Sequence, residues 1–162
     1  MTTSPQPPFQ AFLDEHRQPV LAYLRAAVGH GDADDVFQET FIAALRAYDR
    51  MDGRHPRAWV MTIARRKAID HYRARARRPQ PRKELPEQPV PGPEAQAGDA
   101  EVWTAVSQLS DAQRDAVALR FAADLSYREI GETLEISEPA ARRRVSDALA
   151  ALREQVDRED VA

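Results

Sequence analysis

A proline-rich stretch near the middle of the chain constrains the fold more than any other feature. Proline lacks a backbone N–H and has a fixed φ, so closely spaced prolines exclude a helix or an inner strand. The stretch also has few apolar side chains to bury. Its prolines are Pro79, Pro81, Pro86, Pro89, Pro91 and Pro93. We therefore expect a flexible linker over residues 78–100 that joins two small domains, residues 1–77 and 101–162.

The segment before the linker has the apolar spacing of helices. Apolar residues at helical spacing run over residues 9–28, and Pro19 predicts a kink there or a junction between two abutting helices. A second helix is expected to begin at Asp32 as its N-cap and to end before Asp52. A third helix is expected over residues 56–77, with a proline in its first turn. The stripe predicted to be buried on the second helix consists of Phe37, Phe41, Ala44, Leu45 and Tyr48.

The segment after the linker also predicts helices, so we expect an all-α fold. Ser110 with Gln113, and Ser126 with Glu129, have the spacing of capping boxes that open two helices. Ser137 is expected to cap the last helix. One further helix would precede these three and would contain Val102, Trp103 and Val106.

A turn at residues 135–137 separates the last two helices and has the length expected within a helix-turn-helix. The apolar pattern of the last helix leaves Arg142, Arg143 and Arg144 near its outward side. The recognition helix of this motif presents its N-terminal residues to base edges in the major groove, where arginine commonly reads guanine. The alternative is a structural hairpin with a solvated arginine run. The capping signals and the turn length favour DNA binding.

The net charge of −3 conceals one strongly basic segment. Residues 55–83 carry 10 basic and 1 acidic side chains, whereas residues 1–54 and 84–162 are both net acidic. Trp59, His71 and Tyr72 lie among these basic residues, a composition that suits phosphate neutralisation and stacking on unpaired bases. For Trp59, packing in the core is the better interpretation. The preference for arginine over lysine is explained at least equally well by a GC-rich coding sequence.

Residues 32–41 place four carboxylates and a glutamine within about two helical turns. Helix capping accounts for the aspartates from Asp32 to Asp35, but it accounts less well for Glu39. The spacing differs from that of calcium-binding loops, which need glycine. A protein partner with basic groups would fit this segment.

Metal, cofactor and catalytic chemistry are not expected. Cysteine is absent, and the four histidines lack the helical spacing of metal ligands. Neither a glycine-rich phosphate loop nor a nucleophile elbow is present. We expect no membrane span and no secretory signal, and the lack of cysteine suits the reducing cytoplasm.

Three stretches resemble the extracytoplasmic-function (ECF) RNA polymerase sigma factors of the sigma-70 superfamily. Residues 32–41 are similar to the family's polymerase-docking helix, and residues 59–73 to its promoter-melting and minus-ten-reading helix. Residues 126–144 are similar to its minus-thirty-five-reading helix-turn-helix. The resemblance covers roughly residues 9–77 and 101–156. It implies a non-catalytic factor that directs core RNA polymerase to promoters and initiates transcription.

The resemblance also implies partners and roles for individual residues. The implied partners are core RNA polymerase, promoter DNA and an anti-sigma factor wedged between the two domains. Residues implied to bind polymerase are Asp32, Asp34, Asp35, Gln38 and Glu39. Residues implied to contact minus-ten DNA are Arg54, His55, Arg65, Arg66, Lys67, His71, Arg73 and Arg75, and the loop at residues 50–55 would hold a flipped-out base. Residues implied to contact minus-thirty-five DNA are Tyr127, Arg128, Ser137, Glu138, Ala140, Arg142, Arg143 and Arg144.

Two other functions are compatible with parts of this pattern. A free-standing DNA-binding regulator would use the basic segment and the helix-turn-helix but would not need the acidic helix at residues 32–41. A decoy that occupies polymerase without binding DNA would not need Arg142, Arg143 and Arg144. Residues 139–141 and 146–147 depart from the family's recognition helix, so the promoter sequence cannot be derived from the chain.

Overall fold

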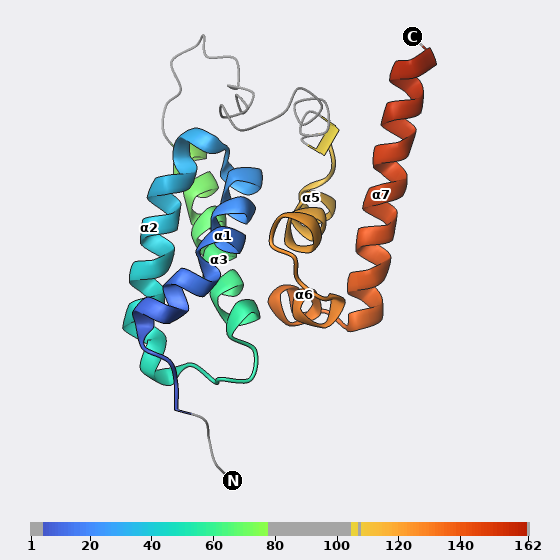
Figure 1. The fold of residues 1–162 in the computed structure, drawn as a ribbon. Helices are drawn as coiled ribbons and strands as arrows, with labels where there is room; N and C mark the ends of the chain where they lie inside the picture. The colour runs from blue at the N-terminus through green and yellow to red at the C-terminus, as the bar shows by residue number, and fades with distance from the viewer. Residues whose placement is uncertain (1–4, 78–104, 107, 162) are drawn as a thin grey trace.

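The computed structural model describes residues 5–77, 105–106 and 108–161, and Figure 1 shows them as two groups of helices side by side. All regular elements in this part of the chain are helical, so the prediction of an all-α fold with two helical domains is confirmed. The predicted linker and the predicted helix around Trp103 lie outside the described residues, apart from Ala105 and Val106. None of the described helices is long and apolar enough to cross a membrane.

The first group contains α1 (Phe9–Val28), α2 (His30–Ala47), the short 3-10 helix η1 (Tyr48–Arg50) and α3 (Pro56–Arg77). The three α-helices contact one another pairwise. Their shared core is aromatic at one end, where the rings of Phe12 and Tyr48 lie 5.1 Å apart. Gly29 joins α1 to α2 with a φ of 85°, a conformation that side chains disfavour.

The structure narrows or corrects three details of the sequence prediction for this group. α1 runs through Pro19 as one helix, so of the two predicted alternatives the pair of abutting helices is excluded. The prediction of Asp32 as an N-cap is wrong, because α2 begins at His30 and Asp32 lies inside its first turn. Leu45 is 56% exposed, not buried, because it lies on the solvent side of α2 beside Ile42.

The second group contains α5 (Asp111–Val117), a turn of π-helix η2 (Ala118–Ala122), α6 (Tyr127–Leu134) and α7 (Glu138–Val161). Both predicted capping boxes are confirmed, at Ser110 and at Ser126. Ser137 accepts a hydrogen bond from the backbone N–H of Ala140 at 3.2 Å, so the cap of the last helix is confirmed as well. These caps satisfy N–H groups that the first turn of each helix leaves without an internal partner.

The two groups pack against each other, although the sequence suggested two separate modules. α1 contacts η2, and α3 contacts α6. One apolar cluster spans both groups and includes Leu24 and Ala64 from the first, and Leu119 and Leu125 from the second. The structure therefore shows a closed arrangement in which the facing sides of the two halves are buried together.

Candidate protein and nucleic-acid interfaces

The turn between α6 and α7 has the geometry of a helix-turn-helix. Glu135 ends α6 in the left-handed conformation with a φ of 59°, and the N–H of Ile136 donates to the carbonyl of Gly131 at 2.9 Å. A Cβ atom on Gly131 would lie 2.7 Å from the Ile136 carbonyl oxygen, so only glycine fits there. The turn thereby fixes the direction in which α7 leaves α6.

The first turns of α7 present basic side chains to solvent. Arg142 and Arg143 are exposed and Arg144 is half-buried, while Ala141 and Val145 face the core. The guanidinium carbons of Arg142 and Arg120 each lie 4.8 Å from the centroid of the Tyr127 ring. The remaining residues predicted on this surface are also exposed, namely Arg128, Ser137, Glu138 and Ala140. The structure therefore brings Tyr127 and Arg142 together at the start of α7, whereas the guanidinium of Arg128 lies 3.7 Å from Glu132 within α6.

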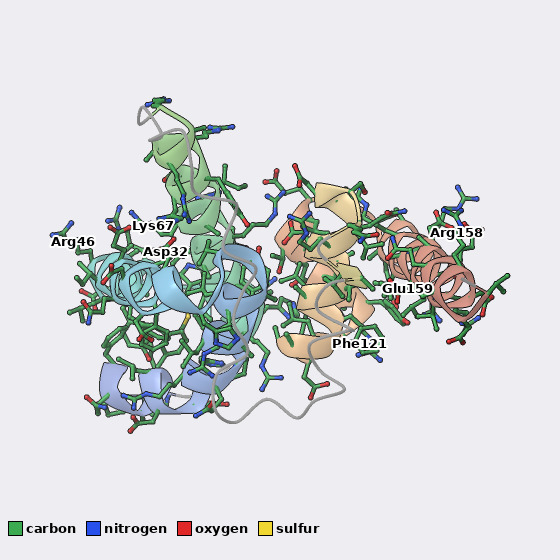
Figure 2. The ribbon with its side chains drawn as sticks, turned by 90° about the horizontal axis from the view of Figure 1, so that it is seen from above. Asp32, Arg46, Lys67, Phe121, Arg158 and Glu159 are labelled. Atoms are coloured by element: carbon green, nitrogen blue, oxygen red, sulfur yellow. The ribbon has the colours of Figure 1, made fainter. Side chains whose placement is uncertain are left out.

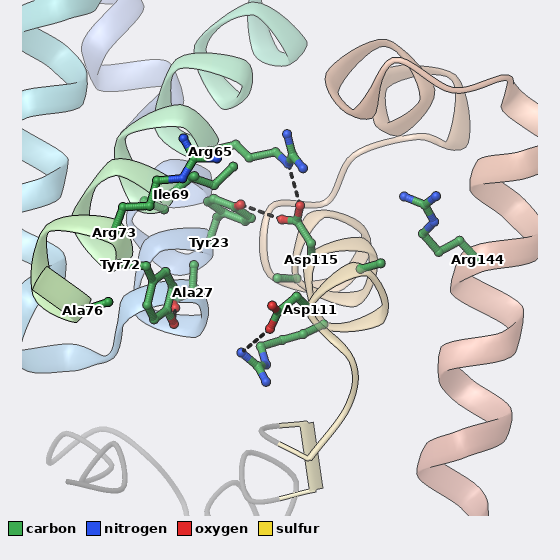
Figure 3. Close-up of a pocket in the computed structure, with 14 residues that line it drawn as sticks. Tyr23, Ala27, Arg65, Ile69, Tyr72, Arg73, Ala76, Asp111, Asp115 and Arg144 are labelled. Atoms are coloured by element: carbon green, nitrogen blue, oxygen red, sulfur yellow. Dashed lines mark hydrogen bonds and ion pairs between the residues drawn. The ribbon is translucent and has the colours of Figure 1, made fainter. Parts of the chain in front are cut away.

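The predicted minus-ten residues of α3 fall into two groups. Arg66 and Arg73 are exposed, and Lys67 is half-buried on a side of the first group away from α7 (Figure 2). Arg65 instead points toward the second group, where its Nε lies 2.6 Å from Oδ2 of Asp115 (Figure 3). The structure thus separates Arg65 from Arg66 and Lys67, whereas Arg73 lines the same cavity between the two halves as Arg65.

Asp115 is the centre of a contact between the two halves. Its other carboxylate oxygen accepts a hydrogen bond from the hydroxyl of Tyr23 at 2.6 Å. Burial, followed by the charge of Asp115, raises the pKa of Tyr23 well above its ordinary value. Burial alone would lower the pKa of Arg65, but the hydrogen bond to Asp115 and its charge outweigh burial and raise that pKa. The carboxylate of Asp115 therefore contacts two helices of the first group, α1 through Tyr23 and α3 through Arg65.

Two histidines predicted to contact minus-ten DNA have carboxylate neighbours. His71 Nε2 lies 3.1 Å from Oδ2 of Asp32, and Arg75 Nη1 lies 2.8 Å from the same oxygen. His55 Nε2 lies 3.3 Å from Oε1 of Glu132, which belongs to α6. A cavity of about 200 Å³ opens between these elements; its lining includes Asp52, Arg54, His55, Trp59, Thr62 and Glu132. In the closed arrangement Glu132 therefore borders the cavity formed by the loop predicted to hold a base.

The outer face of α2 is acidic at one end and apolar at the other. Asp34, Asp35, Gln38 and Glu39 are exposed along it, as predicted for a docking surface. Ile42 is 52% exposed and continues the same face together with Leu45. Asp32 differs from the other four predicted residues because its carboxylate contacts α3.

A larger cavity of about 590 Å³ lies between the two halves (Figure 3). Its lining combines the aromatic rings of Tyr23 and Tyr72 with the basic side chains of Arg65, Arg73 and Arg144. The part of the chain that the structure describes contains no cluster of side chains suited to hold a metal ion. The cavity lining also includes the carboxylates of Asp111 and Asp115.

Several residues at these interfaces are not predicted from the sequence. Asp115, Glu132 and Tyr23 have no signal in the sequence, because their roles arise only when the two halves pack together. Leu45 is predicted to be buried but is exposed, since apolar residues at helical spacing occur on docking faces as well as in the chain's own core. Ile42, which is exposed beside it, carries no prediction.

Comparison with known families assigns both halves. Residues 12–78 match the family model for Sigma-70 region 2, and residues 105–154 match that for Sigma-70, region 4. The ECF RNA polymerase sigma factor SigC of Mycobacterium tuberculosis is 31% identical over 157 residues, covering 94% of this chain and 85% of SigC. The ECF sigma factor ShbA of Streptomyces griseus is 36% identical over 152 residues, covering 82% of this chain and 79% of ShbA.

Solved structures share the fold. The sigma factor RpoE in complex with the anti-sigma factor NepR, from Bartonella quintana, has a TM-score of 0.76 at 23% identity, over 92% of this chain and 96% of RpoE. CnrH in complex with the cytosolic domain of CnrY has a TM-score of 0.69 at 26% identity, over 92% of this chain and 87% of CnrH. The order of the two matched regions agrees with the order of the two helical groups. The chain therefore belongs to the ECF sigma factors of the sigma-70 family, which direct RNA polymerase to promoters to initiate transcription.

Proposed function

We propose that this protein uses three separate surfaces, one to bind polymerase and two to recognise promoter DNA. The outer face of α2 docks on core RNA polymerase, the loop before α3 and the basic side of α3 open and read minus-ten DNA, and the start of α7 reads minus-thirty-five DNA. The observation that carries this proposal is exposure: each surface keeps charged side chains in solvent on a helix whose opposite side is buried. We assign the corresponding domains to residues 1–77 and 101–162, with residues 78–100 as the tether.

Polymerase docking on α2 is supported by the mixed character of its outer face. Asp35 and Glu39 provide charge, while Ile42 and Leu45 provide apolar area, a combination typical of protein interfaces. A double charge reversal, Asp35→Lys with Glu39→Lys, should weaken binding to core polymerase by more than about tenfold, since like charges across an interface are strongly unfavourable.

The same reversal on the exposed end of α7, Glu154→Lys with Asp157→Lys, is the matched control. It changes the net charge equally on a surface outside the proposed interface. Binding affinities for purified core polymerase would be compared for the two variants. Equal affinities would contradict docking through α2.

Minus-ten recognition is supported by the cavity beside Trp59 and His55. An unstacked base needs an enclosed pocket with an aromatic or polar lining to offset the cost of leaving the stack. In the closed arrangement Glu132 borders this cavity, so we infer that the second half moves away before DNA enters. The tether would allow that movement and would let the two domains reach separate promoter elements.

An anti-sigma factor is the inhibitory partner that we propose. The solved structures of RpoE with NepR and of CnrH with the cytosolic domain of CnrY are complexes of this kind. In this chain the lining of the cavity of about 590 Å³ combines apolar and aromatic side chains with Arg73 and Arg144, which suits an apolar helix with acidic residues. Affinity purification of the full chain from its host tests the proposal, and recovery of polymerase without a small inhibitor would contradict it.

The proposed activity needs no catalytic residue in this chain, because the chemistry of RNA synthesis belongs to polymerase. Since polymerase and promoter DNA lie in the bacterial cytoplasm, we place the protein's action there. Transcription from a host promoter by purified core polymerase tests the whole proposal. The expected result is initiation at a specific start site only when this chain is added, and a lack of initiation would contradict it.

A further inference from the structure

The C-terminal end of α3 has little apolar packing to hold it. The buried residues of this helix end at Ala68, and from residue 72 to residue 77 every residue is exposed. Figure 2 shows this end of α3 projecting beyond the other helices of the first group. Helix ends without tertiary packing fray, because propensity alone stabilises a short helix only marginally. Polar contacts must therefore fix the direction of this basic segment.

Those contacts come from the junction of α1 and α2. Oδ2 of Asp32 lies 2.8 Å from Arg75 Nη1 and 3.1 Å from His71 Nε2, two residues one turn apart on α3. The residue next to His71, Tyr72, donates a hydrogen bond from its hydroxyl to the carbonyl of Ala27 at the end of α1. Asp32 is 36% exposed and His71 is 26% exposed, so this is a partly desolvated site where charge-assisted hydrogen bonds are strong.

We propose that Asp32 is a positioning residue for the promoter-binding end of α3 and acts through His71 and Arg75. The inference rests on the proposed use of α3 in minus-ten recognition. It assigns Asp32 a different task from Asp35 and Glu39, which face solvent on α2. A polymerase contact would leave the carboxylate free, whereas this one accepts from two basic side chains of the same protein.

The electrostatics of the site support positioning over simple attraction. A carboxylate among arginines lowers the local positive potential and so weakens non-specific binding to phosphate. A carboxylate beside this basic segment is useful only if fixing the direction of the helix end matters more than the positive charge that it neutralises. Asp32 therefore weakens the general attraction to phosphate but fixes the position of Arg73 and its neighbours.

The test uses the full chain carrying Asp32→Asn, with Asp35→Asn and Asp157→Asn as matched variants that each remove one carboxylate. For Asp32→Asn we expect unchanged affinity for core polymerase and a rate of open-complex formation about three- to tenfold lower, the effect of losing one or two half-exposed ion pairs. Asp35→Asn should lower the affinity for core polymerase. Asp157→Asn, on the exposed end of α7, controls for net charge.

Two further readouts separate positioning from a general structural role. Amide hydrogen exchange in Asp32→Asn should accelerate over residues 69–77 while the buried part of α3 stays protected. Asp32→Glu should restore part of the open-complex rate. In a His71→Gln, Arg75→Gln background, Asp32→Asn should have no additional effect, because the groups through which it acts are gone.

Three results would overturn the inference. One is an open-complex rate in Asp32→Asn equal to that of the unmodified chain, and another is a loss of polymerase affinity matching that of Asp35→Asn. The third is a loss of open-complex rate that is just as large when Asp32→Asn is added to the His71→Gln, Arg75→Gln background. This comparison also tests the inference if Asp32→Asn alone is poorly folded. Failure of the unmodified chain to initiate transcription would instead contradict the proposed function.

Discussion

The two basic helices, α3 and α7, hold their cationic side chains in different ways. On α3, Arg65 and Arg75 lie within 2.8 Å of carboxylate oxygens of Asp115 and Asp32. On α7, Arg142 lies 3.7 Å from Glu138 and rests on the ring of Tyr127 instead. A carboxylate fixes a guanidinium but cancels its charge, whereas an aromatic ring fixes it and leaves the charge in place. In the closed arrangement the start of α7 therefore keeps the positive charge of Arg142 available, while the charges of Arg65 and Arg75 on α3 are paired with carboxylates.

The difference follows from where each helix lies. α3 packs between α1, α2 and α6, so carboxylates of other elements reach it. The basic turn of α7 has neighbours from α5 and α6 of its own group, and Arg142 and Arg143 stay exposed there. The pair of Arg65 with Asp115 therefore depends on the closed arrangement of the two halves, whereas the pair of Arg75 with Asp32 lies within the first group. The following predictions test how each helix uses its basic side chains.

Removing the arginines of α7 should have the largest effect. Arg142→Ala, Arg143→Ala and Arg144→Ala together should lower promoter-specific initiation by about a hundredfold or more, since one arginine contact to guanine contributes about 1–3 kcal/mol. Affinity for core polymerase should not change, because α2 is intact. In vitro transcription and polymerase binding would be measured on the same protein. Normal initiation by the triple variant would show that these arginines are only a solvated face.

Asp115→Asn should loosen the contact between the two halves. The substitution weakens the pair with Arg65 and the hydrogen bond from Tyr23, so the free energy of unfolding should fall by about 1–2 kcal/mol, a discounted value because Arg65 is partly exposed. The radius of gyration from small-angle scattering should rise. Asp111→Asn, on the same helix but fully exposed, is the control. An unchanged scattering profile would show that the apolar cluster alone keeps the halves closed.

The architecture could be predicted from the sequence to a large extent, because the signals for it are local. Capping pairs such as Ser126 with Glu129, and helical apolar spacing, place the helices to within a few residues. The start of α2 was misplaced because Asp32 is a good capping residue by type, but its carboxylate is used in a tertiary contact with α3. Local propensity gives way when a partner from another helix is available.

The residue types of the candidate surfaces could be predicted from the sequence, but the contacts that each side chain makes could not. Arg65 and Arg66 are neighbours of the same type, and only the packed fold shows that Arg65 contacts Asp115 while Arg66 faces solvent. Asp115 and Glu132 have no distinguishing pattern, since exposed acids are common on helices. Contacts between residues 50 or more positions apart depend on how two helical groups dock, which no local pattern encodes.

Tyr127→Leu should have a smaller effect than either substitution above. The apolar volume is largely kept, but the ring that holds Arg142 is lost, so discrimination for the minus-thirty-five element should fall about two- to fivefold, as expected for one exposed cation–π contact. Tyr127→Phe keeps the ring and should keep the discrimination. Competition between matched and substituted minus-thirty-five sequences measures the ratio. A loss in Tyr127→Phe equal to that in Tyr127→Leu would point to the hydroxyl and not to the ring.

His16 is a third kind of basic side chain, buried and without a hydrogen bond, whose Nε2 lies 3.9 Å from Oε2 of Glu15. It is 2% exposed at the contact between the halves, and both ring nitrogens lack a hydrogen-bond partner among the described residues. Burial, the dominant effect, lowers its pKa below the ordinary value of 6.5; the nearby charges act with smaller weight, Glu15 and Glu129 raising it and Arg57 lowering it.

The direction of the pH effect follows from linkage. A pKa that is lower in the folded state than in the unfolded state means that the unfolded chain binds the proton more readily. The stability from keeping His16 neutral is therefore complete above pH 6.5 and is lost as the pH falls through the folded-state pKa. Urea unfolding at pH 7.5 and 5.5 should show that His16→Leu loses less stability on acidification than the unmodified chain does. The difference between the two proteins isolates the contribution of His16 from those of the other histidines. Equal losses would mean that the closed contact tolerates a charged imidazole at this position.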